Sequence, residues 1–172
     1  DLTPIGCEAK PMAKKIIEVG LTPVSEYYGS EVMLHYPGLY AGSTDLVCLH
    51  NDLETIVDFK QANRPKKEEW IQDYYLQIAA YAMAHDYVYK SEIKQGVVMV
   101  CTPDLYYQEF KISGADLRSY KHKFLKRLDM YHELKFDTKE NIIKQGDLES
   151  LLKEMQADVE VDPKESNEKR KT

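Results

Sequence analysis

The feature that most constrains the fold is a pair of strand-like segments joined by a very short turn. Residues 39–49 and 53–61 are rich in β-branched, aromatic and aliphatic side chains, and Asn51-Asp52 lies between them. Two such runs separated by a tight polar turn are typical of a β-hairpin. The pattern therefore predicts two adjacent antiparallel strands in the middle of the sequence.

The short turn also predicts which residues of the two strands face each other. A two-residue loop pairs His50 with Leu53, and counting outward from that pair places Asp45 opposite Asp58. A four-residue loop gives the same register, whereas a β-bulge would shift it. Because side chains alternate along a strand, Lys60 projects from the same face as Asp58. The register therefore predicts two carboxylates and one ammonium in one patch.

Two facing carboxylates repel each other unless a cation compensates them. Hard divalent cations such as Mg²⁺ take carboxylate oxygens, so Asp45 and Asp58 are candidate metal ligands. Lys60 would then orient or deprotonate an attacking water, or stabilise charge on a phosphate in the transition state. The alternative is an ordinary salt bridge on a solvated sheet face. Asp58 disfavours that alternative because it interrupts the apolar run 55–59, where an unpaired acid is costly to bury.

The remaining segments predict an α/β (α+β) layout in which helices cover a central mixed sheet. The other expected elements are a helix over about 8–19, a strand over 25–35, a helix over 68–89, strands over 96–102 and 105–112, and helices over 115–134 and 147–156. Glu31, on the strand that precedes the hairpin, is the best candidate for a third carboxylate at the metal, ahead of Glu26.

Length, charge and composition predict one folded domain. The chain has 172 residues with 43% hydrophobic content, enough to bury one core. Its net charge of −6 disfavours a protein that coats nucleic acid through bulk charge, although an enzyme needs only a local basic groove. We expect the domain over residues 1–136, with its core at about 25–112, and a charged helix and tail over 137–172.

The cysteines and histidines predict no metal centre of their own. Three widely spaced cysteines suit reduced thiols in a cytosol-like compartment, and Cys48 and Cys101 lie in apolar runs typical of a core. The five histidines have no ligand spacing. No apolar run is long enough to span a membrane, and the first residues lack the layout of a signal peptide.

Three short motifs resemble those of RecB-type nucleases of the PD-(D/E)xK superfamily. Residues 40–45 match a GxxD motif, residues 56–60 match a DxK motif, and Gln77 with Tyr81 matches a QxxxY motif. Each motif is weak alone, but their order, their spacing and the predicted strand, strand and helix that carry them match as well. The resemblance covers about residues 25–112 and is nearest to phage exonucleases and the mitochondrial genome maintenance exonuclease.

The resemblance implies a restriction-endonuclease-like core and a DNA exonuclease that hydrolyses phosphodiester bonds in replication, recombination or repair. It implies that Asp45, Asp58, Glu31 and the backbone carbonyl of Phe59 or Gln61 hold Mg²⁺ or Mn²⁺, and that Lys60 is catalytic. The expected partners are single-stranded DNA or DNA ends and a recombination or replication protein, with no membrane. The cysteine cluster that binds iron-sulfur in some relatives is absent, so no such cofactor is expected.

Two departures from the family pattern concern the neighbourhood of the metal. Many relatives carry an upstream histidine there, and this chain has no obvious counterpart. Gln61 follows the lysine where threonine or serine is frequent.

The residues expected to contact substrate are Gln61, Arg64, Lys66, Lys67, Gln77 and Tyr81. The basic residues among them follow the catalytic strand, where a phosphate backbone could pass, but they fit a solvated turn equally well. For the QxxxY pair, the alternative is a core tyrosine with a glutamine that forms a local hydrogen bond. The late helix interleaves basic and aromatic residues at 118–127, which fits a groove wall or the charged outer face of an amphipathic helix.

Two other functions fit the same residues. An endonuclease that cuts DNA or RNA would use the same core, and a non-catalytic nucleic-acid-binding module could retain the fold. The binding module is disfavoured because Asp45, Asp58 and Lys60 are all present. We expect a cytoplasmic location in a bacterium or phage-infected cell, or a mitochondrial one in a eukaryote.

Overall fold

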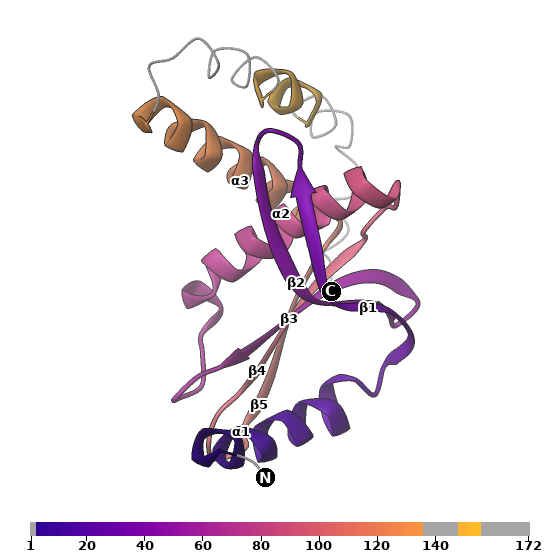
Figure 1. Ribbon diagram of the computed structural model, residues 1–172, viewed down its shortest axis with the longest axis vertical. Helices are drawn as coiled ribbons and strands as arrows, with labels where there is room; N and C mark the ends of the chain where they lie inside the picture. Colours follow the sequence, from indigo (N-terminus) through magenta and orange to yellow (C-terminus); the bar gives the residue numbers. More distant parts are fainter. Residues whose placement is uncertain (1–2, 136–147, 156–172) are drawn as a thin grey trace, which may run out of the picture.

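The computed structural model describes residues 3–135 and 148–155. Its elements are α1 (Pro4–Lys15), the π-helical turn η1 (Ile16–Gly20), β1 (Val24–Tyr36), β2 (Tyr40–His50), β3 (Leu53–Gln61), the 3-10 turn η2 (Glu68–Trp70), α2 (Gln72–Tyr89), β4 (Gln95–Cys101), β5 (Tyr107–Ser113) and α3 (Gly114–Lys135). A further helix covers 148–155. This order of helices and strands confirms the one predicted from the sequence (Figure 1).

The five strands form one mixed sheet in the order β1-β2-β3-β4-β5. All neighbours are antiparallel except β3 and β4, which are parallel. A parallel pair needs a long crossover, and α2 provides it. Every residue of β4 is buried, as expected for a strand covered on both faces. The sheet with its flanking helices is the predicted α+β class.

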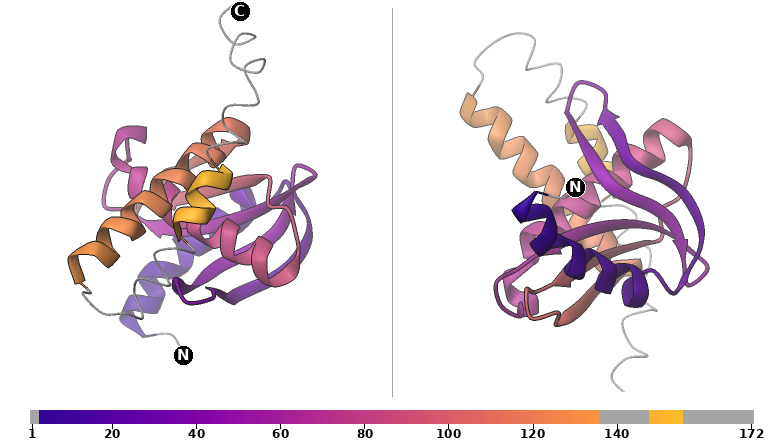
Figure 2. Two further views of the ribbon diagram at one scale, coloured as in Figure 1. Left: turned by 90° about the horizontal axis from the view of Figure 1, so that it is seen from above. Right: turned by 60° about the horizontal axis from the view of Figure 1, so that its bottom comes forward.

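Helices cover the two faces of the sheet unequally. One face packs on α2 through a core that includes Val47, Ile56, Ile78 and Val98. The opposite face packs on α1 and η1 through a smaller cluster around Val57 and Met99. Figure 2 shows α1 on the opposite side of the sheet from α2 and α3. Because side chains alternate along β3, Ile56, Asp58 and Lys60 all face α2.

The predicted register of the hairpin is confirmed. The β2–β3 pairs run from His50–Leu53 to Leu46–Val57. The turn residues Asn51 and Asp52 have φ values of 48° and 61°, which are the left-handed values that a type I′ turn requires and that Asn and Asp tolerate.

Some predicted element boundaries were wrong. The first helix begins at Pro4, earlier than predicted, because the Thr3 side chain caps it by accepting a hydrogen bond from the Gly6 N–H at 3.2 Å. The last strand begins at Tyr107, later than predicted, because Leu105 lies in a turn with φ of 64°.

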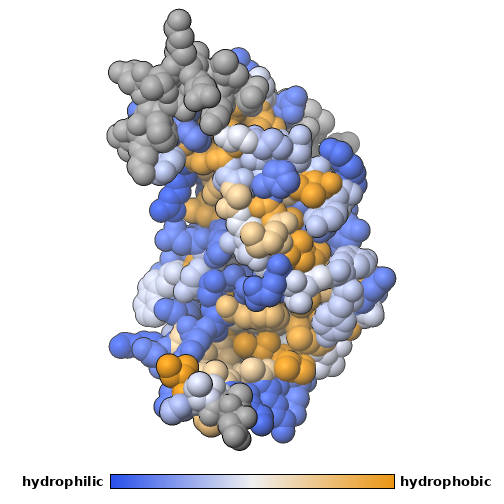
Figure 3. Space-filling model, in the orientation of Figure 1, coloured by the Kyte–Doolittle hydropathy of each residue, from blue (hydrophilic) through white to orange (hydrophobic). Residues whose placement is uncertain are grey.

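Several sequence predictions concern the ends of the chain and its surface. The predicted helix over 147–156 is present at 148–155, but the rest of the charged segment 137–172 lies outside the described residues. Within the described ranges, no helix is long and apolar enough to cross a membrane. Cys48 and Cys101 are buried as predicted, and Cys7 is exposed. Figure 3 shows hydrophilic and apolar side chains interspersed over one face of the molecule.

Candidate active site

Asp45 lies where β2 and β3 stop pairing with each other. The last pair of the β2–β3 ladder is Leu46–Val57, and the next pair would be Asp45 with Asp58. At this point the Oδ2 atom of Asp45 accepts a hydrogen bond from the Phe59 N–H at 2.7 Å. The N–H and C=O of one strand residue point to the same side, so the Phe59 carbonyl also faces β2. The Asp45 carboxylate and this carbonyl therefore lie close together.

Asp58 is a buried acid with one unsatisfied oxygen. It is 2% exposed, and its Oδ1 accepts a hydrogen bond from Lys60 Nζ at 2.8 Å. Its Oδ2 is buried without a hydrogen-bond partner among the described residues. Burial raises the pKa of Asp58 above its ordinary value, and the nearby Asp45 adds to that effect while Lys60 opposes it. The site therefore carries an anion that the protein alone does not fully compensate.

Lys60 is held between Asp58 and an aromatic ring. Its Nζ lies 5.2 Å from the ring centroid of Tyr74 on α2, within the range of a cation–π contact. The Lys60 side chain as a whole is 25% exposed, compared with 3% for that of Asp58. Lys60 therefore lies between the buried Asp58 and the more exposed part of the site.

The GxxD and QxxxY motifs meet in the structure. A Cβ atom added to Gly42 would lie 2.6 Å from Cε1 of Tyr81, so the tyrosine packs directly on the glycine backbone. Gln77 Nε2 donates a hydrogen bond to the Tyr81 hydroxyl at 2.9 Å. Because Tyr74, Gln77 and Tyr81 share one face of α2, they line the sheet from Lys60 to Gly42. The local Gln77 hydrogen bond of the alternative is observed, and the contact of this pair with substrate stays a prediction.

A Gly42→Ala substitution tests the contact between the two motifs. The added methyl group would overlap the Tyr81 ring, and relief of such overpacking costs about 1–3 kcal/mol of stability. We expect a lower free energy of unfolding in a urea titration, and the Tyr81→Leu background should remove most of the loss. An equal loss in both backgrounds would show that Tyr81 is not the cause.

Glu31 lies across from Asp45 on the neighbouring strand β1, but its side chain does not form a three-carboxylate group with Asp45 and Asp58. It lies between the pairs Ser30–Leu46 and Val32–Thr44 of β1 and β2, is exposed and has a φ of 52°. Within residues 3–135 and 148–155, no group of three or more His, Cys, Asp or Glu side chains is placed to hold a metal ion. The role of Glu31 as a third metal ligand therefore stays a prediction.

Comparison with known proteins supports the fold. No protein-family model matches the sequence, and no curated protein matches it significantly. A solved structure of a candidate exonuclease from Eubacterium rectale aligns with 76% of this chain and 52% of its own, with a TM-score of 0.52 and 14% identity. The chain has a restriction-endonuclease-like core. It spans about half the length of that neighbour.

Two further structural neighbours are more distant from this restriction-endonuclease-like core. They are an alkaline exonuclease from Laribacter hongkongensis and the same enzyme in complex with dAMP. Each alignment covers 76% of this chain and 72% of the other, with identities of 16% and 18% and TM-scores of 0.39 and 0.38. Scores this low add nothing to the fold assignment.

The acidic pair of this core fits a hard divalent cation. Asp45 and Asp58 offer carboxylate oxygens, the Phe59 carbonyl faces the same strand, and Asp58 Oδ2 is buried without a partner in the described part of the chain. Oxygen donors of this kind suit Mg²⁺ or Mn²⁺. A cation would also compensate the charge that burial penalises.

The loop after β3 carries the predicted basic residues. The Lys66 backbone forms two hydrogen bonds with the Gln108 side chain on β5, at 2.7 and 3.0 Å, which fixes the loop to the sheet edge. Arg64 and Lys67 are exposed, and Lys67 Nζ lies 5.3 Å from the ring centroid of Trp70. The loop therefore presents Arg64 and Lys67 to solvent from an anchored backbone, and Lys66 is half-buried.

Gln61 is not brought to the acidic pair. The alternation of β3 places its side chain on the face opposite Lys60. Gln61 is exposed and lines a small cavity whose walls include Met12 and Ile16 as well as Phe59 and Lys60. The sequence did not lead us to predict that Tyr74 contacts Lys60 or that Gln108 anchors the loop after β3. The spacing of Tyr74, three residues before Gln77 on one helix face, was the signal that could have found the first of them.

Basic residues of α3 mainly tie this helix to α2. Arg127 pairs with Asp73 at 2.7 Å and Lys121 with Asp86 at 3.1 Å. Lys123 lies over the Tyr120 ring at 4.4 Å. These contacts favour the interpretation of α3 as a helix with a charged outer face over its interpretation as a groove wall that binds nucleic acid.

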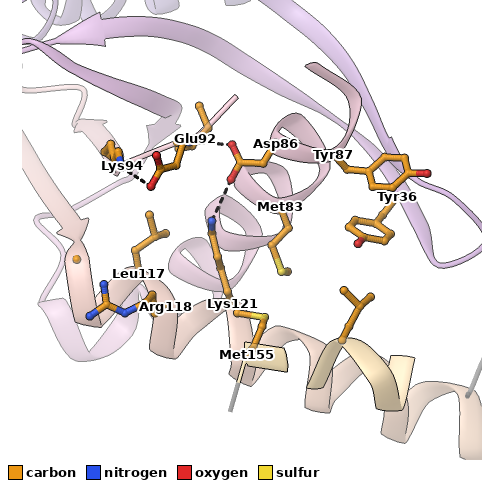
Figure 4. A pocket seen from close by; sticks show the side chains of 13 residues that line it. Tyr36, Met83, Asp86, Tyr87, Glu92, Lys94, Leu117, Arg118, Lys121 and Met155 are labelled. Atoms are coloured by element: carbon orange, nitrogen blue, oxygen red, sulfur yellow. Dashed lines mark hydrogen bonds and ion pairs between the residues drawn. The ribbon is translucent and has the colours of Figure 1, made fainter. Parts of the chain in front are cut away.

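A cavity of about 520 Å³ lies on the other half of α2, where it meets α3 and the helix over 148–155 (Figure 4). Its central carboxylate, Asp86, accepts hydrogen bonds from Ile93 N–H at 2.7 Å, Ser91 Oγ at 3.0 Å and Lys121 Nζ at 3.1 Å. Asp86 is satisfied in this way, and the second carboxylate of the cavity, Glu92, pairs with Lys94. The cavity is therefore a structural junction between helices.

Proposed function

We propose that the protein is a metal-dependent DNA exonuclease that hydrolyses phosphodiester bonds. The observation that carries the proposal is the buried Asp58, which binds Lys60 through one oxygen and leaves the other unsatisfied beside Asp45. A buried carboxylate oxygen without a partner among the described residues suits a bound cation. The solved structural neighbour is described as a candidate exonuclease, which supports the same reaction.

In this proposal Asp45, Asp58 and the Phe59 carbonyl hold Mg²⁺ or Mn²⁺, with Glu31 as a further ligand. A divalent cation at such a site stabilises negative charge on a phosphate. Lys60 then orients the attacking water or donates a hydrogen bond to the phosphate oxygens. Its contact with Tyr74 restrains the ammonium close to the acidic pair.

We further propose that the enzyme acts on single-stranded DNA or DNA ends in replication, recombination or repair, together with a protein of those processes. The basic side chains of Arg64, Lys66 and Lys67 support a nucleic-acid substrate because they present cations beside the end of β3. The buried thiols Cys48 and Cys101 suit a reducing compartment, whether cytoplasmic or mitochondrial.

A cleavage assay tests the proposed reaction directly. We expect end-labelled linear single-stranded DNA to be degraded with Mg²⁺ or Mn²⁺, and EDTA to stop degradation because the acidic pair then lacks its cation. Circular single-stranded DNA should stay intact. Cleavage of the circle would show an endonuclease instead, degradation of RNA alone would show a ribonuclease, and cleavage in EDTA would exclude the proposed metal site.

A further inference from the structure

A second cavity lies between α2, α3 and the hairpin formed by β1 and β2. It has a volume of about 450 Å³, within the size range of small-molecule sites. The side chains that matter for its chemistry are Tyr40, Leu76, Gln77, Tyr81 and Phe124. All of them are half-buried, so each keeps part of its surface open to the cavity or to solvent.

This cavity shares Gln77 and Tyr81 with the surroundings of the proposed catalytic site. Gln77 and Tyr81 line it, and the same Tyr81 packs on Gly42. Gly42 and Asp45 are three residues apart on β2, which corresponds to about 10 Å along a strand. A polymer with a phosphate at the acidic pair would therefore have a neighbouring nucleotide within reach of the cavity.

The walls of the cavity are aromatic and fixed in place. Tyr40 and Phe124 meet edge to face, with ring centroids 4.9 Å apart and an angle of 75° between the rings. The Tyr40 hydroxyl donates a hydrogen bond to the Ala80 carbonyl at 2.9 Å, which holds its ring in position. A rigid aromatic corner of this kind offers flat surfaces against which a planar ring can stack.

The rim of the cavity carries polar groups. Gln77 donates to the Tyr81 hydroxyl through Nε2, which leaves its carbonyl oxygen as an acceptor for a base edge. At the opposite rim Arg127 pairs with the exposed Asp73, and Lys123 lies one helical turn earlier on α3. Arg127 is thus neutralised by Asp73, so the match to a nucleobase comes from the aromatic interior and the Gln77 carbonyl.

Resting on the proposed function, we infer that this cavity receives one unstacked nucleobase of a single-stranded nucleic acid whose backbone crosses the acidic pair. A base inside a duplex is stacked and paired on both sides, and bringing it into the cavity would cost its unstacking. The cavity therefore selects single strands or frayed ends over intact duplexes.

The test measures binding without cleavage, in an Asp58→Asn background, by fluorescence anisotropy of a labelled single-stranded oligonucleotide. Phe124→Leu keeps an apolar side chain but removes the ring face, so we expect about tenfold weaker binding, the size of one stacking contact. An abasic position moved along the oligonucleotide should cause a similar loss at one position only. That loss should disappear in the Phe124→Leu variant, because both changes remove the same contact.

The control is Tyr89→Leu, an exposed aromatic at the far end of α2, which should leave binding unchanged. The inference is overturned if no abasic position weakens binding, if the two losses add independently, or if a blunt duplex binds as tightly as the single strand. If the parent protein shows metal-dependent cleavage but the abasic position and Phe124→Leu do not weaken binding as predicted, only this inference is refuted. If these two changes weaken binding as predicted but the parent protein cuts no DNA, only the proposed reaction is refuted.

Discussion

An Asp58→Asn variant is expected to lose metal-dependent cleavage by at least about 10³-fold, while its metal-free form folds at least as stably as the parent at neutral pH. The loss of activity follows because an amide carries no charge for the cation and Asp58 is one of the two acids of the site. The stability follows because burial raises the Asp58 pKa. Burial therefore disfavours ionisation of Asp58 in the folded parent, and the asparagine removes that cost.

The stability difference has a defined pH dependence. A carboxyl group with a raised pKa in the folded state favours folding below its unfolded pKa of about 4 and loses that contribution as pH rises through its folded pKa. The advantage of Asp58→Asn should therefore vanish at low pH, which urea titrations at several pH values will measure. The same substitution at the exposed turn residue Asp52 is the matched control and should change neither stability nor cleavage. Full activity in Asp58→Asn would remove Asp58 from the site.

A Lys60→Met variant is expected to lose both activity and stability at neutral pH. Methionine supplies no proton and no positive charge for the phosphate, so cleavage should fall by about 10²-fold or more. The Asp58 carboxylate, only 2% exposed, loses the ammonium that binds its Oδ1 at 2.8 Å. Removing one partner of a buried pair costs up to about 3–5 kcal/mol, and partial exposure of Lys60 places this case at the lower end.

A double-mutant cycle separates the two effects of Lys60→Met. In the Asp58→Asn background the lysine has no charged partner, so adding Lys60→Met should cost little stability while activity stays absent. The stability loss of the single variant should also shrink towards low pH, where Asp58 is protonated in both proteins. The exposed Lys10→Met on α1 controls for the loss of a surface charge. A stability loss that is the same in both backgrounds would contradict the ion pair as its cause.

Local patterns were sufficient to predict the hairpin and the residues in it. The alternation of side chains and a two-residue turn are short-range properties, so the pairing from His50–Leu53 to Leu46–Val57 and the common face of Asp58 and Lys60 followed directly from the order of the residues. The helix over α2 was predicted for the same reason, because its apolar positions recur at helical spacing.

Other features of the site depend on contacts between segments that are distant along the chain. The Asp45 carboxylate binds the Phe59 N–H because the two strands separate at this point, and no strand pattern encodes where a ladder ends. The Lys60–Tyr74 contact requires α2 to cross this face of the sheet at one particular position. The resemblance, and not the structure, assigns Glu31 to the metal: the residue is exposed and lies across from Asp45 with a φ of 52°. Strand alternation puts the Gln61 side chain on the face opposite Lys60.

The sequence by itself determined the order of the elements, the register of the central hairpin and the identity of the acids and the lysine, because each of these depends on spacing along a few residues. Only the tertiary structure decided that Asp58 is desolvated with one oxygen unsatisfied, that Gly42 must lack a side chain because Tyr81 packs on it, and that α2 and α3 leave an aromatic cavity beside β2. Burial, close packing and cavities arise from the way complete elements fit together, so spacing along the chain does not contain them.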